Sequence, residues 1–114
     1  MHDLWRQLSQ DFRTRYVVFE FKNYNRRVLP DQIFLTEKYL YPSALRCFAI
    51  IITRGGVHKN AIRAAKGVLR DSGKLILICT VSEVLKMLHA KDQGDDPNDL
   101  LWYAVDEFLT DTAP

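Results

Sequence analysis

The chain has 114 residues, of which 47% are hydrophobic and 26% charged, and this is the size and composition of one ordinary globular domain. No apolar run approaches the roughly 20 residues that a membrane-spanning helix needs, and the opening segment MHDLWRQLSQ lacks the pattern of a secretory signal, so we expect no membrane association. The net charge of +2 conceals an asymmetry, because residues 1–80 carry 14 Lys and Arg against 6 Asp and Glu, whereas residues 81–114 carry 2 against 8. The asymmetry predicts one surface for an anionic partner and an acidic surface elsewhere.

The first half of the chain predicts a helix over 3–13, a strand over 15–23 and a helix over 31–41. The first helix follows from apolar residues at helical spacing, namely Leu4, Trp5, Leu8 and Phe12. Pro30 precedes the second helix and Pro42 is expected to end it, because proline lacks a backbone N–H and disfavours helix in the residue before it. The expected inner side of this helix consists of Ile33, Phe34, Leu40 and Tyr41.

The second half predicts strands over 45–53 and 74–80, both apolar enough to be covered on two faces. Residues 53–56, Thr-Arg-Gly-Gly, are expected to turn into a helix over 57–71. A helix over 82–91, capped by Ser82, and a last helix capped by Asp96 complete the chain. The expected buried residues of the first and last of these helices are Ile62, Ala65, Leu69, Leu101, Ala104, Val105 and Phe108.

The element order αβαβαβαα predicts an α/β protein in which helices flank a parallel or mixed central sheet. Helical crossovers between covered strands require parallel neighbours with helices packed on both faces. No repeat or linker divides the chain, so we expect residues 1–114 to form a single domain. Cys47 and Cys79 both lie in strand-like apolar runs and are interpreted as small buried residues in a reducing cytosol, which favours a cytoplasmic location.

The first strand raises a question, because Glu20 and Lys22 interrupt an apolar run. Side chains alternate across a strand, so Val17, Phe19 and Phe21 are expected to form its core face, while Glu20 and Lys22 share the other face near the C-terminal end. In open α/β sheets that end is where ligands usually bind. A buried carboxylate costs several kcal/mol unless it is paired or bound to a metal. Glu20 and Lys22 therefore either pair with each other, face solvent, or form a ligand site.

The segment VVFEFKNY, followed by DQIFLTEKYLYP and then by CFAIIITRGG and a helix, resembles the PD-(D/E)xK nuclease superfamily, in particular its Mrr-type restriction-endonuclease-like domains. The resemblance covers residues 15–80. It implies a restriction-endonuclease-like core that hydrolyses DNA phosphodiester bonds with Mg²⁺ or Mn²⁺. It also implies that Glu20 is the metal-binding carboxylate, the carbonyl of Phe21 a backbone ligand, Lys22 the motif lysine and Gln32 the helix glutamine that orients the lysine or the attacking water.

The chain departs from this family where the second metal-binding carboxylate is expected. The family's pattern begins with an aspartate on a preceding strand, and in this chain the candidate is Asp11, which is either a metal ligand or a solvated residue of the first helix. Two explanations stay open: the chain is a C-terminal fragment whose first strands lie before Met1, or it is a short form without catalysis. A fragment would have an exposed sheet edge, which favours a homodimer through that edge or through the C-terminal helices.

Basic residues supply the candidate DNA contacts. Four lie in one line along the predicted helix over 57–71 and two follow the first strand; they are Lys59, Arg63, Lys66, Arg70, Arg26 and Arg27. They are either solvated surface charges or a track for the DNA backbone, which positions a duplex without reading its sequence. The alternative function is therefore a non-catalytic DNA-binding or protein-assembly module on the same fold.

Overall fold

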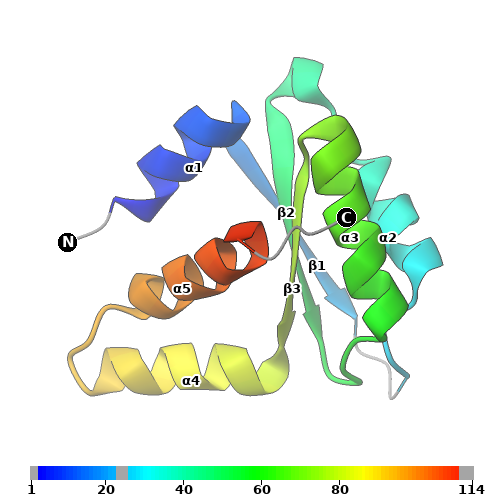
Figure 1. Cartoon of the computed structure of the whole chain (residues 1–114). Helices are drawn as coiled ribbons and strands as arrows, with labels where there is room; N and C mark the ends of the chain where they lie inside the picture. Colours follow the sequence, from blue (N-terminus) through cyan, green and yellow to red (C-terminus); the bar gives the residue numbers. More distant parts are fainter. Residues whose placement is uncertain (1–2, 23–25, 111–114) are drawn as a thin grey trace.

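The computed structural model describes residues 3–22 and 26–110, and it is an α/β protein with a parallel sheet (Figure 1). The strands are β1 (Tyr16–Lys22), β2 (Arg46–Thr53) and β3 (Leu75–Thr80). The helices are α1 (Leu4–Phe12), α2 (Pro30–Glu37), α3 (Lys59–Ser72), α4 (Val81–Asp92) and α5 (Pro97–Thr110), with a short 3₁₀ turn η1 (Pro42–Ala44). None of the helices in the described ranges has the length and apolar composition needed to cross a bilayer.

The three strands are hydrogen-bonded in the order β1-β2-β3 and run parallel. In the register, Lys22 at the end of β1 lies beside Thr53 of β2, which in turn lies beside Thr80 of β3. The predicted α/β class and the element order αβαβαβαα are thus confirmed, and the sheet is parallel rather than mixed.

Helices cover the sheet on both faces, with α2 and α3 on one side and α1, α4 and α5 on the other (Figure 1). The two faces of each strand feed separate cores, because alternate side chains point in opposite directions. The core under α2 and α3 contains Val28, Ile33, Leu40, Ala49, Ile51, Ala61, Ala65, Val68 and Ile76. The core under α1, α4 and α5 contains Leu4, Leu8, Phe48, Ile50, Leu75, Leu77, Cys79, Leu101 and Val105.

Helix α2 is shorter than predicted, and two of the four residues that were predicted to be buried on its inner side are exposed. Ile33 and Leu40 are fully buried, but Phe34 and Tyr41 are about half exposed. Phe34 directly follows Ile33 and so lies about 100° around the helix from it, away from the sheet. Tyr41 precedes Pro42 and adopts extended backbone angles, as residues before proline generally do. Pro42 therefore begins η1 instead of ending α2.

The helix caps confirm one prediction and correct another. Asp96 accepts a hydrogen bond from the backbone N–H of Asn98 at 2.9 Å, as expected of the residue before α5. Helix α4, by contrast, is capped by Thr80 and not by Ser82: the Thr80 hydroxyl accepts from the N–H of Glu83 at 3.2 Å, and the Glu83 carboxylate accepts from the N–H of Thr80 at 3.1 Å. This reciprocal capping box satisfies two groups at once and outcompetes a cap two residues later.

The inner faces of α3 and α5 follow the prediction in part. Ala65, Leu101 and Val105 are buried as expected, but in α3 the fully buried neighbours of Ala65 are Ala61 and Val68, while the other predicted residues are only partly buried. Gly73 ends α3 with φ of +67°, a left-handed conformation that glycine adopts without strain.

The largest correction concerns β1. Phe19 and Phe21, predicted to be core, are 61% and 62% exposed. The helices on their side of the sheet pack on β2 and β3, and of the β1 side chains only Val17 contacts that core. Strand β1 lies at the edge of the sheet, so its outer half extends beyond the helical cover.

Candidate active site

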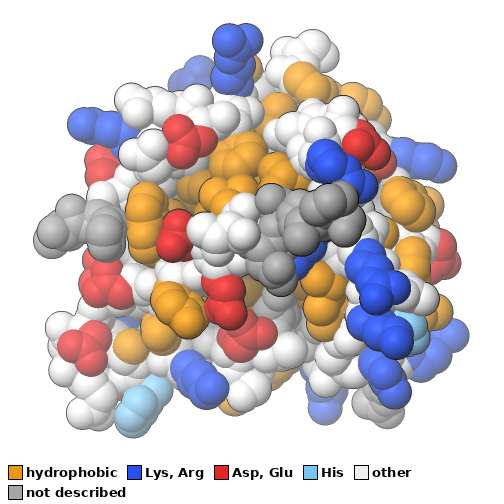
Figure 2. All heavy atoms as spheres, in the orientation of Figure 1, with side chains coloured by type: hydrophobic (Ala, Val, Ile, Leu, Met, Phe, Trp, Pro, Cys, Tyr) orange, Lys and Arg blue, Asp and Glu red, His pale blue; other side chains and the backbone are white. Residues whose placement is uncertain are grey.

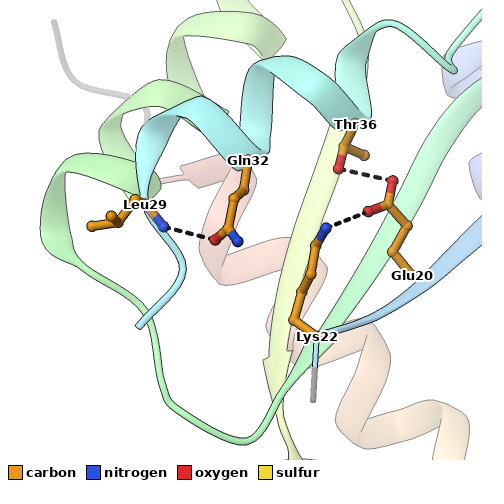
Figure 3. A network of polar contacts seen from close by, with 5 residues as sticks. All are labelled: Glu20, Lys22, Leu29, Gln32 and Thr36. Atoms are coloured by element: carbon orange, nitrogen blue, oxygen red, sulfur yellow. Dashed lines mark hydrogen bonds and ion pairs between the residues drawn. The ribbon is translucent and has the colours of Figure 1, made fainter. Parts of the chain in front are cut away.

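Glu20 and Lys22 lie together on the face of β1 that is turned toward α2, near the C-terminal end of the strand. The Lys22 ammonium is 3.1 Å from Oε2 of Glu20, and the two side chains are only 16% and 20% exposed, respectively. The sequence-based expectation that both project from one face is confirmed. Of the alternatives left open, direct pairing is what the structure contains (Figure 3).

Two residues of α2 point into the same space as this ion pair. The Thr36 hydroxyl donates a hydrogen bond to the other carboxylate oxygen, Oε1 of Glu20, at 2.9 Å. Gln32, one turn earlier, uses its carbonyl oxygen to accept from the backbone N–H of Leu29 at 3.1 Å, while its amide nitrogen points toward Lys22 (Figure 3). Gln32 therefore has a structural role as part of the N-terminal cap of α2.

Thr36 is the site residue that sequence reasoning missed. Its side chain is fully buried although it is polar. A signal was present, because Thr36 lies four residues after Gln32 and three after the buried Ile33, which places it on the inner face of α2. A buried hydroxyl at such a position needs a polar partner, and in this structure that partner is Glu20.

The backbone of β1 gives Phe21 a distinct role. The carbonyl of Lys22 accepts a hydrogen bond from the N–H of Arg54, which follows β2. The N–H of Tyr16 donates to the carbonyl of Leu45, which precedes β2, so the backbone groups of both Tyr16 and Lys22 face β2. Successive residues of a strand direct their backbone groups to opposite edges. The carbonyl of Phe21 therefore points to the unpaired edge, away from β2.

Asp11 is not brought to this site. It lies in α1, on the opposite face of the sheet, where it accepts from the Gln7 amide at 3.0 Å and lines a hollow with Trp102 and Asp106 of α5. The Glu20 carboxylate is instead held against α2. The structure therefore does not bring Asp11 beside Glu20, because the sheet separates the two carboxylates.

The predicted basic residues divide into two groups. Arg26 and Arg27 after β1, together with Lys59 and Arg63 in the first turns of α3, are exposed at the C-terminal end of the sheet. Figure 2 shows Lys and Arg side chains gathered over this lower half of α3, and acidic side chains over α4 and α5 on the other side. The predicted charge asymmetry therefore corresponds to two different surfaces of the fold.

Lys66 and Arg70, which were predicted to lie in one line with Lys59 and Arg63 along this helix, contact other side chains. The Lys66 ammonium lies 5.7 Å from the centre of the Phe108 ring, within cation–π range. Arg70 is 3.6 Å from Asp71 in the last turn of α3. Because Arg70 follows Lys59 by eleven residues, it lies roughly 16 Å further along the helix axis, at the other end of the sheet.

The residues around Glu20 fit a hard divalent cation only in part. A carboxylate has about four lone-pair positions, of which Thr36 and Lys22 occupy two in this structure, and the carbonyl of Phe21 faces the open edge. Mg²⁺ is commonly held by one or two carboxylates with water and substrate phosphate. Within residues 3–22 and 26–110, however, no group of three or more His, Cys, Asp or Glu side chains is arranged to hold a metal ion.

Cys47 and Cys79 are both buried, and neither forms a disulfide. Burial, and to a lesser extent the neighbouring Glu83 carboxylate, raise the pKa of the Cys79 thiol to about 11, so this side chain is a neutral thiol at physiological pH. Thiolates are the reactive form, and Cys79 is therefore a packing residue of β3.

Comparison of the chain with models of protein families, with curated proteins and with solved structures yields no match.

Proposed function

We propose that this chain is a divalent-metal-dependent DNA endonuclease domain with a restriction-endonuclease-like core. The observation that carries the proposal is the placement of Glu20 and Lys22 as a mostly buried pair on one face of β1, 3.1 Å apart. The pair lies at the C-terminal end of a parallel strand, where α/β sheets usually bind ligands. Such a pair, with Gln32 on the adjoining helix, has the residue types that the PD-(D/E)xK resemblance implies.

In this proposal Glu20 and the carbonyl of Phe21 hold the cation, and water and a DNA phosphate complete its coordination. The bound Mg²⁺ or Mn²⁺ would supply Lewis-acid stabilisation of the phosphate and a lowered pKa for a bound water. Lys22 places a positive charge next to the position where negative charge develops during phosphodiester hydrolysis. Thr36 orients the Glu20 carboxylate through its hydrogen bond at 2.9 Å, which makes it a positioning residue.

The surrounding charge supports a DNA substrate. The cationic residues Arg26, Arg27, Lys59 and Arg63 follow β1 and β2 at the same end of the sheet as Lys22. Contacts of this kind bind phosphates without reading bases, and their contribution falls steeply with salt.

The test is nicking of supercoiled plasmid with Mg²⁺ or Mn²⁺. We expect metal-dependent nicking that is lost in Glu20→Gln and falls by at least about 100-fold in Lys22→Met, the range in which single electrostatic groups contribute. Asp106→Asn on α5 is the matched control, since it removes one carboxylate that lines a hollow with Asp11 on the other face of the sheet. Nicking by Glu20→Gln at the wild-type rate would show that Glu20 is not the metal ligand.

A second candidate is a DNA-binding module without catalysis. The observation that favours it is that the described residues contain no group of three or more His, Cys, Asp or Glu side chains arranged to hold a metal ion, while Lys22 already offsets the charge of Glu20. This module would bind DNA in a salt-sensitive way and lose affinity when Lys59 and Arg63 are changed to Glu, while Lys86→Glu with Lys91→Glu on α4 would have a smaller effect. Salt-sensitive binding with no metal-dependent nicking would favour this candidate over the endonuclease.

A further inference from the structure

The outer edge of β1 carries unused hydrogen-bonding groups. Among the described residues β1 pairs only with β2, through the backbone groups of Tyr16, Val18, Glu20 and Lys22. The alternating direction of backbone groups then leaves the N–H and C=O of Val17, Phe19 and Phe21 directed to the free edge. Exposed strand edges are templates for pairing with another chain.

The apolar face of the same strand is uncovered. Phe19 and Phe21 are each exposed by about three fifths, and both belong to the set of residues whose backbone faces the edge. The usual means of protecting an edge are missing from Tyr16–Lys22: the strand has no proline, and its two charged residues lie on the other face, paired with each other. The bulge in the pairing with β2, between Tyr16 and Val17, lies at the start of the strand.

We propose that β1 is a self-association surface, which pairs antiparallel with β1 of a second copy of this chain with Phe19 opposite Phe19. In this register Val17 lies opposite Phe21 of the second copy, so all three residues with free backbone groups meet one another. Each of these pairs is of the hydrogen-bonded type, in which both residues exchange N–H···O bonds. The carbonyl of Phe21 uses one of its two lone pairs in this exchange, and the other stays available for the cation proposed above. The open edge is thus complementary to itself about a two-fold axis, as a symmetric dimer requires.

The side chains also fit this register. On the apolar face, the Phe19 rings of the two copies are cross-strand neighbours and Val17 packs beside Phe21, which are favourable pairings of aromatic and β-branched residues. On the other face, Glu20 lies opposite Val18 and Lys22 opposite Tyr16, so like charges do not meet directly. The two Glu20 residues are diagonal neighbours at roughly 7–8 Å, and the Lys22 of each copy offsets its charge at 3.1 Å.

The geometry favours a closed dimer of modest affinity. A phenylalanine buries about 150–250 Å² in a protein interior, so three fifths of four such side chains amounts to roughly 500 Å². Interfaces that bury less than about 1,200 Å² in total are typically weak and transient, so association should depend on concentration. The opposite edge strand, β3, is almost wholly buried, so among the described strands only β1 presents an accessible edge, which favours a closed dimer over a fibre.

Sedimentation velocity over a dilution series of the 114-residue chain tests the association. We expect a monomer–dimer equilibrium that Phe19→Lys shifts to monomer by at least 10-fold in dissociation constant. Phe34→Lys is the matched control, because Phe34 is 49% exposed but lies on α2 and lines a hollow against α3. A wild-type monomer at all concentrations, or a dimer that survives Phe19→Lys, would overturn the proposal.

A disulfide test reports the register independently. The native cysteines are buried, so an introduced surface cysteine dominates oxidation. Under mild oxidation Phe19→Cys should form a covalent dimer, because directly opposed residues have Cα atoms about 5.5 Å apart. Phe21→Cys should not link to itself, since its symmetry mate is four residues further along, roughly 13 Å away. Equal cross-linking of the two variants would contradict the register. If the edge of β1 binds a strand of another protein and not a second copy, neither variant should form a covalent dimer, and the proposal would be wrong.

Discussion

The two edge strands of the sheet, β1 and β3, have similar apolar sequences but opposite surroundings. Every residue of β3 is buried or half-buried, and α3, α4 and α5 pack around it. β1 exposes Phe19 and Phe21 on one face and carries the Glu20–Lys22 ion pair on the other. In the sequence, the apolar set Val17, Phe19 and Phe21 of β1 looks as much like core as β3 does, and only the position of the strands relative to the helices distinguishes them. The difference indicates that β3 contributes mainly to the core and that β1 is the more accessible of the two strands.

Shortening a buried side chain of β3 should lower the stability of the fold more than any other change considered. Leu75 is fully buried within the core under α1, α4 and α5, so Leu75→Ala removes packed methyl groups and leaves a cavity. We expect the free energy of unfolding to fall by about 2–5 kcal/mol. Urea denaturation followed by circular dichroism measures it, and a loss below about 1 kcal/mol would mean that β3 is less tightly covered than this structure shows.

The thiol of Cys79 should make the stability of β3 depend on alkaline pH. Burial, with a smaller contribution from Glu83, raises its pKa in the folded protein to about 11 from an ordinary value near 9. A raised pKa favours the neutral thiol in the folded state, so this contribution is complete below about pH 9 and is lost as pH rises toward 11. Two pH units correspond to roughly 2–3 kcal/mol.

The control for that pH dependence is Cys79→Ala, which removes the titrating group. We expect the stability of this variant to decline less between pH 9 and 11 than that of the wild type, in urea titrations at each pH. Identical slopes would show that the Cys79 thiol is not the group responsible.

Breaking the Glu20–Lys22 ion pair of β1 should lower the free energy of unfolding by less than the Leu75→Ala substitution does. Lys22→Met leaves the Glu20 carboxylate, which is 20% exposed, with Thr36 as its remaining partner. We expect a loss of about 1–3 kcal/mol, the cost of leaving a partly buried charge without its partner. The double variant Glu20→Gln with Lys22→Met should recover part of this loss, and urea denaturation of the set would show the coupling.

The exposed phenylalanines of β1 should matter least. Phe21→Ser removes a side chain that is 62% exposed, and we expect the free energy of unfolding to change by no more than about 0.5 kcal/mol. The measurement must be made at low protein concentration, because a dimer would add its own stabilisation. A loss comparable with that of Leu75→Ala would mean that Phe21 is covered in solution.

Much of the fold could be predicted from the sequence, since hydrophobic period, proline and glycine positions and caps are local signals. The order of elements, the parallel sheet and the shared face of Glu20 and Lys22 all follow from such signals. The exposure of Phe19 and Phe21 could not be predicted, because it depends on how far the helices on that face extend across the sheet.

For the same reason, only part of the candidate site could be predicted from the sequence. The pair at positions 20 and 22 depends only on the alternation of side chains in a strand. The partnership of Glu20 with Thr36 and the separation of Asp11 from Glu20 depend on where α2 and α1 pack, on opposite faces of the sheet. Local patterns do not specify that arrangement.

We propose above that the C-terminal end of β1 binds a divalent metal ion through Glu20. Crystals of the chain soaked in Mn²⁺ and measured at the manganese absorption edge test it most directly. We expect an anomalous peak at coordinating distance from the Glu20 carboxylate and the carbonyl of Phe21, and no such peak in crystals of Glu20→Gln. A peak elsewhere on the chain, or one that persists in Glu20→Gln, would contradict it.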